Sequence, residues 1–315
     1  MKPLPIHFAP LQGFTEDVYR RLHNQIFGHV DCYYTPFLRI EHGSVRSKDL
    51  RDIKPEFNEG VNVVPQIICS NGKEAEMLTG TVISRGYRRI DINMGCPFPL
   101  QTRHGRGAGI LVAPDKVAAV CQVIKNHPEI SFSVKMRLGL ESGEDWKQVL
   151  PILNDTPLEH ITLHPRIASQ QYSGSVDMDG FEAFMLQCRH NLIYNGDIRS
   201  AQDIRNLQQQ YPTLAGVMVG RGLLSRPSLA AEYAEGTEWA RNQIINKIKE
   251  LHSLLQQHYA DTIPGESAQW QKLRTFWEYF EPVEGQDSLL DRKQWKKIKK
   301  AGNMKNYMIA VEQIY

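Results

Sequence analysis

Several patterns that would point directly to a function are missing from this sequence of 315 residues. Its five cysteines, at positions 32, 69, 96, 121 and 188, form no C-x-x-C pair. This excludes a disulfide framework and a zinc-binding pattern, and it fits a reducing compartment. No apolar run is long enough to predict a membrane-spanning helix, and the segment Met1 to Pro5 lacks the charged and apolar regions of a signal peptide. We therefore expect a cytoplasmic protein that has no membrane partner.

Two kinds of catalytic site are also missing. The sequence has no cluster of His, Cys, Asp or Glu with metal-ligand spacing, and no pair of carboxylates that suggests glycosidase chemistry. With 41% apolar residues, 23% charged residues and a net charge of +2, the composition is that of an ordinary globular protein with a sizeable core. We expect no bound metal ion, and we expect a monomer.

Short apolar segments alternate with helix-like segments up to about residue 235. Helices are predicted at 16–27, 73–84, 114–126, 145–153 and 200–210, and strands at 5–10, 31–38, 62–68, 88–92, 131–136, 160–164, 191–194 and 215–219. Eight strands with intervening helices predict a parallel sheet, and eight is the number that closes a (β/α)8 TIM barrel. We predict this α/β barrel over residues 1–236.

The remaining residues, 237–315, contain no strand pattern. A helix with an apolar stripe is predicted from Trp239 to Ala260 and a second at Gln269–Phe280. An acidic loop at Glu281–Asp287 precedes a last helix that reaches Tyr315. This order predicts an all-α helical bundle, appended to the barrel as a second domain.

The last predicted helix carries a run of basic residues. Between positions 292 and 305 there are seven Lys or Arg residues and no acidic residue. A run of this kind is usually a solvated helix face. Aromatic residues at positions 295 and 307, and Arg274 with Trp277 upstream, favour instead a surface for the phosphate backbone of a nucleic acid.

Cys96 is the candidate catalytic residue. The strand predicted at 88–92 is followed by Asn93-Met94-Gly95-Cys96-Pro97, in which glycine and proline end the strand. The cysteine is thus predicted on a loop beside the amide of Asn93, where backbone is irregular and substrates approach. The glycine-rich stretch 105–109 follows within a dozen residues. The alternative is the ordinary one for a cysteine, a small buried apolar residue.

Lys135 and His164 are predicted at the ends of two further strands, where barrel enzymes place their functional groups. In a pocket of neutral amides, Lys135 is suited to stabilise an anionic ring, such as the charge near N1 and the C2 oxygen of a reduced flavin. His164 can donate a hydrogen bond to the same ring. The alternatives are a salt bridge for Lys135 and a core position for His164.

Two glycine-containing segments follow the seventh and eighth predicted strands. They are Asn195-Gly196-Asp197 and Gly220-Arg221-Gly222, at the place where barrels commonly bind phosphate. Glycine lets backbone N–H groups approach phosphate oxygens, a following helix N-terminus adds a favourable dipole, and an arginine binds phosphate with its forked guanidinium. The alternative is that both segments are plain turns between a strand and a helix.

Taken together, these segments resemble the tRNA-dihydrouridine synthases, flavin-dependent enzymes with a barrel and a C-terminal helical domain. The matching segments follow in order along the chain: Ala9–Asp17, Gln66, Asn93–Pro97, Gly105–Gly109, Lys135–Gly139, His164–Arg166, Asn195–Asp197 and Gly220–Gly222. The resemblance implies FMN in the mouth of the barrel. The residues implied to bind it are Pro10, Leu11, Gln66, Asn93, Lys135, His164, Arg166, Asn195, Gly196, Asp197, Gly220 and Arg221.

The resemblance also implies the reaction. NADPH, or alternatively NADH, reduces the flavin, and a hydride passes from N5 to C6 of a uracil ring in tRNA. Cys96 then supplies the proton to C5, because a thiol with a pKa of about 8.5 is mostly protonated at neutral pH. The residues implied to bind the RNA are Arg103, Arg106, Arg274, Lys293, Lys296, Lys297 and Lys300.

Two other functions stay open from the residues alone. One is a barrel flavoenzyme that reduces a free pyrimidine or another RNA, and the other is a non-catalytic RNA-binding protein. The sequence also departs from the resembled family at three positions: Pro36 stands in place of a glutamate, Pro99 or a neighbour in place of a lysine, and Ile167 in place of a threonine. These departures concern the target nucleotide and leave FMN binding as expected.

Overall fold

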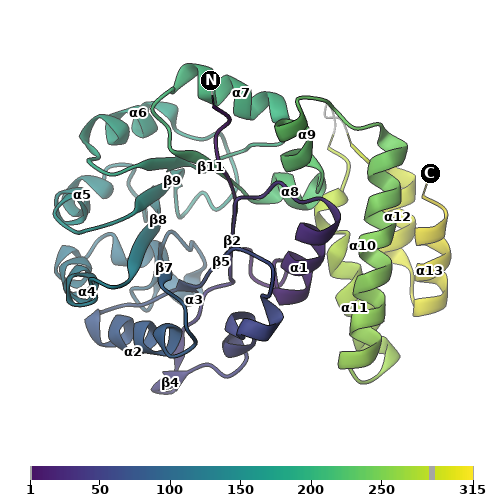
Figure 1. Cartoon of the computed structure of the whole chain (residues 1–315), viewed down its shortest axis with the longest axis horizontal. Coiled ribbons are helices and arrows are strands. Elements are labelled where there is room, and N and C mark those ends of the chain that lie inside the picture. Colours follow the sequence, from purple (N-terminus) through teal and green to yellow (C-terminus); the bar gives the residue numbers. More distant parts are fainter. Residues whose placement is uncertain (1, 284–287, 315) are drawn as a thin grey trace.

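Eight buried strands form a closed parallel barrel in the computed structural model, which describes residues 2–283 and 288–314 (Figure 1). The strands are β1 (Ile6–Phe8), β2 (Cys32–Tyr34), β5 (Val63–Val64) with β6 (Gln66–Ile67), β7 (Arg89–Met94), β8 (Ser131–Gly139), β9 (His160–Ile167), β10 (Leu192–Tyr194) and β11 (Gly216–Val219). The hydrogen-bonded order is β5-β2-β1-β11-β10-β9-β8-β7-β6. Because β5 and β6 are consecutive and separated only by Pro65, which has no N–H to donate, they are two halves of one strand and the ring closes. The predicted TIM barrel is confirmed.

Helices surround the barrel, and the five helices predicted from the sequence are present. They are α1 (Asp17–Ile26), α2 (Gly72–Ile83), α4 (Pro114–Asn126), α5 (Trp146–Asn154) and α7 (Ala201–Gln210). The helix α6 (Met178–Gln187) was not predicted, and it buries only Phe181 and Phe184. Its start is fixed by Asp177, whose side chain accepts a hydrogen bond from the Gly180 N–H at 2.8 Å.

Short elements fill the loops between these strands and helices. Between β2 and β5 the chain forms a hairpin of β3 (Ile40–Glu41) and β4 (Ser44–Val45) and the 3-10 turns η1 (Asp49–Ile53) and η2 (Pro55–Phe57). After β7 come α3 (Pro99–Thr102) and η3 (Gly107–Ile110), and after β11 come α8 (Arg221–Ser225) and α9 (Leu229–Glu235). Of these elements, α3 and α8 contribute residues that line the candidate site.

The C-terminal region is helical, as predicted. Its elements are α10 (Arg241–Thr262), α11 (Glu266–Phe276), η4 (Glu278–Phe280), α12 (Arg292–Lys300) and α13 (Met304–Glu312). Aromatic side chains form its core, where the Tyr307 hydroxyl accepts a hydrogen bond from Trp277 Nε1 at 2.8 Å and contacts His252 Nε2 at 2.5 Å.

Two details of the predicted helical domain are corrected. The last helix is in fact two helices, because the Asn303 side chain accepts a hydrogen bond from the Asn306 N–H and starts α13 anew. The helix predicted at Gln269–Phe280 stops at Phe276 and continues only as the short turn η4. The predicted acidic loop, Glu281–Asp287, lies partly outside the described residues, at positions 284–287.

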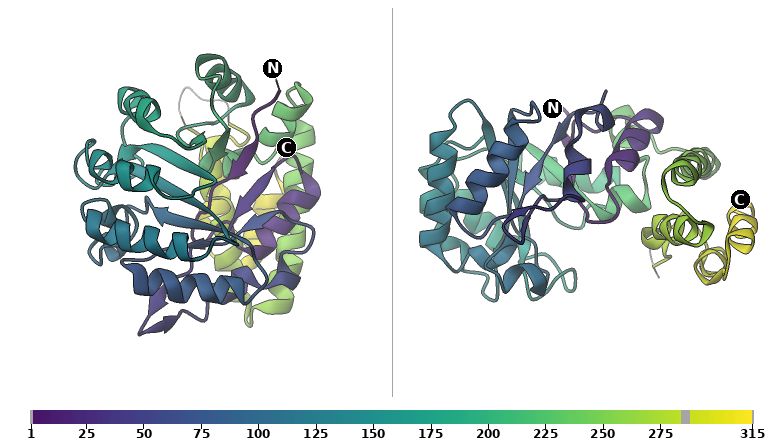
Figure 2. Two further views of the ribbon diagram at one scale, coloured as in Figure 1. Left: turned by 60° about the vertical axis from the view of Figure 1, so that its left-hand side comes forward. Right: turned by 90° about the horizontal axis from the view of Figure 1, so that it is seen from below.

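The C-terminal helical region packs against the side of the barrel that carries α1 (Figure 2). Lys272 Nζ lies 2.8 Å from Glu16 Oε1, and the ring of Tyr279 meets the ring of Phe14 with centroids 4.8 Å apart. Gly236 ends α9 with a φ of 72°, and α10 begins at Arg241. The predicted division at residues 236/237 stays a prediction.

In the described part of the chain, no single helix is both long and apolar enough to cross a membrane. A bent pair, Pro99–Ile110 with Pro114–Asn126, reaches the required length and composition only when its two helices are taken together. Over residues 2–283 and 288–314, no group of three or more His, Cys, Asp or Glu side chains is placed to hold a metal ion.

Candidate active site

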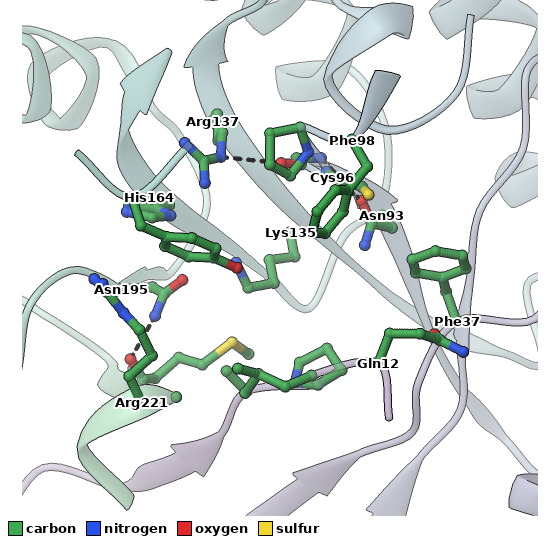
Figure 3. A pocket seen from close by; sticks show the side chains of 18 of the residues that line it. Gln12, Phe37, Asn93, Cys96, Phe98, Lys135, Arg137, His164, Asn195 and Arg221 are labelled. Carbon is green, nitrogen blue, oxygen red and sulfur yellow. Dashed lines mark hydrogen bonds between the residues drawn. The ribbon is translucent and has the colours of Figure 1, made fainter. Parts of the chain in front are cut away.

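A cavity of about 730 Å³ opens at the carboxyl-terminal ends of the barrel strands (Figure 3). Its volume is in the range of small-molecule and cofactor sites, about 300–1,000 Å³. Gln66 and Arg166 are buried behind its wall, with 0% and 1% exposure. The other eleven predicted catalytic and cofactor-binding residues line it: Pro10, Leu11, Asn93, Cys96, Lys135, His164, Asn195, Gly196, Asp197, Gly220 and Arg221. The structure thus brings together residues from six of the barrel strands or the segments that follow them.

Cys96 lies in the cavity wall, two residues beyond β7, with 7% exposure. The side-chain oxygen of Asn93 accepts hydrogen bonds from the backbone N–H groups of Gly95 and Cys96, at 3.0 and 2.8 Å. Burial raises the pKa of the Cys96 thiol, although a hydrogen bond from the backbone of Phe98 works in the opposite direction. The thiol is therefore protonated at neutral pH, which is the state that a proton donor requires.

A chain of hydrogen bonds links this loop to a carboxylate at the centre of the barrel. Asn93 Nδ2 donates to Gln66 Oε1 at 2.8 Å, and Gln66 Nε2 donates to Asp91 Oδ2 at 2.6 Å. Ser133 Oγ donates to the second oxygen, Asp91 Oδ1, at 2.6 Å. The backbone N–H of Cys96 can only donate, so the side-chain oxygen of Asn93 must face it. This fixes the orientation of the Asn93 amide and, through it, that of the Gln66 amide. Gln66 therefore holds Asn93, and Asn93 holds the Cys96 loop.

Asp91 has no exposed surface, and burial raises its pKa from 3.8 to about 6. Its hydrogen bonds with Ser133 and Gln66 and the nearby charge of Lys135 favour the ionised form and limit this rise. The carboxylate is therefore ionised at neutral pH, where it accepts the hydrogen bonds described above.

The glycine-rich stretch 105–109 supports the Cys96 loop from behind. Gly107 has a φ of 57°, and a Cβ at this position would lie 2.6 Å from the backbone oxygen of Cys96. The next residue, Ala108, donates its N–H to that same oxygen at 3.0 Å. Only glycine allows this close approach, so Gly107 is explained by its contact with Cys96.

Lys135 and Arg137 lie two residues apart on β8 and point to the same face of the strand. Arg137 donates to the backbone oxygens of Gly95 and Ile167, at 3.1 and 2.9 Å, and so ties together the loops after β7 and β9. Burial, with repulsion from Arg137, lowers the pKa of Lys135 to about 8. Lys135 is thus still mainly cationic at pH 7, and its side chain extends into the cavity (Figure 3). Among the described residues, its ammonium group has no hydrogen-bonding partner.

His164 is held as a neutral donor. Arg166 Nη1 lies 3.1 Å from His164 Nε2, and since a guanidinium can only donate, the imidazole proton is on Nδ1. Burial and the surrounding cations, with Arg137 the strongest, hold the pKa of His164 well below its ordinary value. The neutral ring can donate one hydrogen bond from Nδ1.

Asp197 joins two arginines at the opposite side of the cavity. Its carboxylate accepts from Arg166 Nη2 at 2.6 Å and from Arg221 Nη2 at 2.8 Å. Burial favours the neutral acid, but the hydrogen bond and charge of Arg166, with the charge of Arg221, hold the pKa of Asp197 below its ordinary value. Asn195, which follows β10, donates to the backbone oxygen of Met218 in β11 at 2.7 Å.

Packing explains two of the glycines that the sequence suggested for phosphate binding. A Cβ on Gly196 would lie 2.8 Å from the hydroxyl of Tyr194, and a Cβ on Gly222 would overlap the backbone oxygen of Ile198. The helix that follows, α8, has five residues, so its dipole is short. A phosphate in this part of the cavity would therefore depend mainly on Arg221.

Two predicted RNA-binding residues make internal contacts instead of presenting free charges. Arg106 pairs with Glu74 through two hydrogen bonds, of 3.0 and 2.5 Å. Arg274 donates to the backbone oxygen of Lys299 at 2.6 Å and lies over the ring of Trp270 at 4.9 Å. Both arginines thus hold loops or helices in place.

The remaining predicted RNA-binding residues lie on two surfaces. Arg103 lines the cavity. Four of the five lysines of α12 line a hollow of their own together with Arg292: Lys293, Lys296, Lys297 and Lys300. One face of α12 is therefore strongly cationic.

Several cavity residues were not predicted. Arg137 could have been, because a spacing of two from Lys135 on a strand places both side chains on one face. Tyr279 could not have been predicted, since it reaches the cavity from the C-terminal helical region and no local sequence pattern shows how that region packs on the barrel. Of the three positions that depart from the resembled family, Pro36 and Pro99 line the cavity, while Ile167 contributes its backbone oxygen to Arg137.

The family of the chain follows from comparison with known proteins. A family model described as dihydrouridine synthase matches residues 7–310. The chain belongs to the dihydrouridine synthase family. It is 26% identical over 262 residues to the tRNA-dihydrouridine(16) synthase of Neisseria meningitidis serogroup B, covering 75% of this chain and 77% of that protein. It is 29% identical over 237 residues to the probable tRNA-dihydrouridine synthase of Treponema pallidum, covering 70% and 68%.

Solved structures show the same fold with little sequence identity. Morphinone reductase superimposes with a TM-score of 0.53 and 11% identity, over 76% of this chain and 88% of that chain. Histamine dehydrogenase from Rhizobium sp. 4-9 superimposes with a TM-score of 0.55 and 9% identity, over 86% of this chain and 49% of that chain. At these identities the likeness concerns the fold alone, and the family assignment rests on the sequence.

Proposed function

We propose that this dihydrouridine synthase family member reduces a uridine of tRNA to 5,6-dihydrouridine, with FMN as its cofactor and NADPH as its reductant. The relatives named tRNA-dihydrouridine synthase support the tRNA substrate. The observation that carries the proposal is that the protonated Cys96 thiol and the unpaired Lys135 ammonium line one cavity.

The cavity fits an anionic cofactor with a ring and a phosphate. Lys135 supplies a positive charge that has no partner among the described residues, and Arg221 supplies a second on the opposite side. Neutral donors suited to a ring are the amide of Asn93 and the Nδ1–H of His164. The ring would lie by Lys135 and His164, and the phosphate by Asn195 to Asp197 and by Gly220 and Arg221. Gln66 and Arg166 would act from behind, through Asn93 and Asp197.

Cys96 completes the reaction as the general acid. When bound and reduced by NADPH, FMN supplies a hydride from N5 to C6 of the uracil ring. The charge that this leaves on the uracil is quenched at C5 by the proton of the Cys96 thiol, and the thiolate then takes a proton from solvent. The Asn93 hydrogen bonds fix the backbone of Cys96, so the thiol is held in one position during proton transfer.

The cationic surfaces suit the RNA. Cys96 is only slightly exposed, so a uridine must leave its base stack to reach it. This unstacking costs a few kcal/mol. The α12 lysines and Arg103 can bind the phosphates around it and offset that cost.

The proposal is tested with purified protein and tRNA from a strain that lacks the gene. The protein should be yellow and release FMN on denaturation, and incubation with NADPH should raise the mass of one tRNA fragment by two hydrogens. Consumption of NADPH with a free pyrimidine, and none with tRNA, would indicate the small-substrate alternative. A colourless protein that takes up no flavin would refute the proposal.

A further inference from the structure

Exposed apolar side chains surround the mouth of the cavity beside the catalytic loop. Of the eight large apolar side chains that are exposed among the described residues, three line this cavity: Phe98, Leu100 and Tyr172. Phe98 and Leu100 are 51% and 79% exposed, although Cys96 is only 7% exposed. Apolar groups gathered in the open beside a site mark a contact surface. Phe98, Pro99 and Leu100 are referred to below as the apolar platform.

The aromatic rings at the mouth differ in what covers them. The guanidinium groups of Arg221 and Arg137 lie over Tyr172, at 4.6 and 5.6 Å from its ring centre, and Tyr279 packs against Phe14. Within residues 2–283 and 288–314, neither a ring nor a cation stacks on Phe98. The face of the Phe98 ring is therefore open to an incoming group, and it lies next to Cys96 in the view of Figure 3.

The backbone holds the platform in place. The backbone oxygen of Phe98 accepts hydrogen bonds from the N–H groups of Gln101 and Thr102, at 2.8 and 3.1 Å. Proline on both sides of Phe98, at positions 97 and 99, restricts φ at each of these residues. A platform that is already ordered loses little conformational entropy when a ligand binds to it.

The charge around the platform suits a polyanion. In the described part of the chain, six Lys and Arg side chains line the cavity but only one acidic side chain, Asp197, which is paired with two arginines. The six cationic residues are Arg39, Arg103, Lys135, Arg137, Arg199 and Arg221. A positively charged groove with an exposed aromatic ring is the usual arrangement for binding single-stranded nucleic acid.

We propose that the apolar platform stacks, through Phe98, on the nucleobase that neighbours the target uridine in the RNA. This inference rests on the proposed function and extends it, because it names the contact that receives the RNA beside the target. The target base must leave its stack to reach Cys96, which deprives a neighbouring base of one stacking partner. Phe98, two residues from Cys96 and at the rim, takes the place of that partner.

The first test compares the binding of tRNA to the FMN-loaded wild type and to variants. Phe98→Ala weakens binding by about 5- to 150-fold, equivalent to about 1–3 kcal/mol per stacked base, while Phe98→Trp keeps the wild-type affinity. Leu186→Ala is the matched control and leaves binding unchanged, because it removes an 84% exposed leucine from α6, which does not border the cavity. The amount of bound FMN shows whether each variant is folded.

Salt dependence separates stacking from charge. Phe98→Ala keeps the wild-type slope of log Kd against log salt concentration, because the ring neutralises no phosphate. Arg103→Ala lowers that slope by about 1. A slope that changes with Phe98→Ala as it does with Arg103→Ala would overturn the proposal.

The second test identifies the base with synthetic RNAs that carry the target uridine and an abasic site at one of its two neighbours. An abasic site at the nucleotide that stacks on Phe98 weakens RNA binding to the wild type. The same abasic site leaves the already weakened RNA binding of Phe98→Ala unchanged. If the abasic site lowers the RNA affinity of both proteins equally, or if Phe98→Ala binds RNA as tightly as the wild type, the stacking role of the platform is overturned. Reduction of tRNA by the wild type would still uphold the proposed function. A wild type that leaves uridine unreduced overturns both.

Discussion

Replacing Asp91 by asparagine should stabilise the protein at neutral pH, although this carboxylate is a central part of the site. Asp91 is fully buried and its pKa is raised from 3.8 to about 6, so folding an ionised Asp91 is unfavourable. At about 1.4 kcal/mol per pH unit, this rise corresponds to a cost of about 3 kcal/mol at pH 7. An asparagine keeps the shape, can accept the hydrogen bond of Gln66, and carries no charge.

The pH dependence gives the sign of the effect. The folded protein binds the Asp91 proton more tightly than the unfolded chain, so stability is lost as the pH rises from about 3.8 through about 6. The stability of Asp91→Asn minus that of the wild type should therefore rise by about 2.5 kcal/mol between pH 4 and pH 7.5. Urea denaturation at a series of pH values measures this difference, and effects of groups common to both proteins cancel.

Asp197→Asn is the control with the opposite sign. The pKa of Asp197 lies below its ordinary value, so its ionised form stabilises the fold at neutral pH, and this contribution is lost as the pH falls. The variant should be less stable than the wild type at pH 7. An Asp91→Asn variant that is less stable at pH 7.5, or a difference that does not change with pH, would refute the assignment of Asp91 as a buried ionised group.

The same change should affect catalysis in a particular way. The charge of Asp91 raises the pKa of Lys135, which lies at about 8. Without that charge Lys135 loses its proton at lower pH, so in Asp91→Asn the alkaline limb of the pH–rate profile should move to lower pH. A variant that only damaged the fold would lower the rate at every pH and leave the limb where it is.

Three further variants test the site and the RNA surface. Cys96→Ala should keep FMN, as measured by absorbance, and lose about 10²- to 10⁴-fold in single-turnover reduction of tRNA, because only the proton donor is gone; loss of flavin would contradict its role. Glutamate at Lys296, Lys297 and Lys300 should weaken tRNA binding and lower its salt slope by at least about 2, with flavin reduction by NADPH unchanged without tRNA; an unaltered slope would remove α12 from the RNA surface. Gly107→Ala should cost about 1–3 kcal/mol of backbone strain at a φ of 57° and displace the Cys96 loop, lowering the single-turnover rate more than the FMN content; a wild-type rate would show that the loop tolerates the Cβ.

The barrel could be predicted from the sequence because its strands are short apolar segments separated by helices with strong periodicity. Seven of the eight barrel strands begin and end within three residues of the predicted ranges, and β2 ends at Tyr34, four residues before its predicted end. The ends of β8 and β9 were predicted too early, because β8 continues to Gly139 and β9 to Ile167. The residues of these extensions include polar side chains that line the site or support it. Local hydrophobicity is a poor guide to strand ends at a functional site, because polar side chains are needed there.

The membership of the cavity was largely predictable, but its internal contacts were not. Residues at the carboxyl ends of parallel strands must meet at one edge of the sheet, which is why residues as distant as Leu11 and Arg221 could be assigned together. The sequence cannot show that Gln66 bonds to Asp91 and Asn93, or that Arg106 is committed to Glu74. These pairings depend on side-chain directions that only the folded chain determines.

The most direct test maps dihydrouridine in the tRNA of a strain that lacks the gene and carries it again on a plasmid. The deletion should remove dihydrouridine from defined tRNA positions, the wild-type gene should restore it, and the Cys96→Ala gene should not. If the deletion strain retains all its dihydrouridine, or if Cys96→Ala restores it fully, a uridine reductase with Cys96 as its proton donor is contradicted.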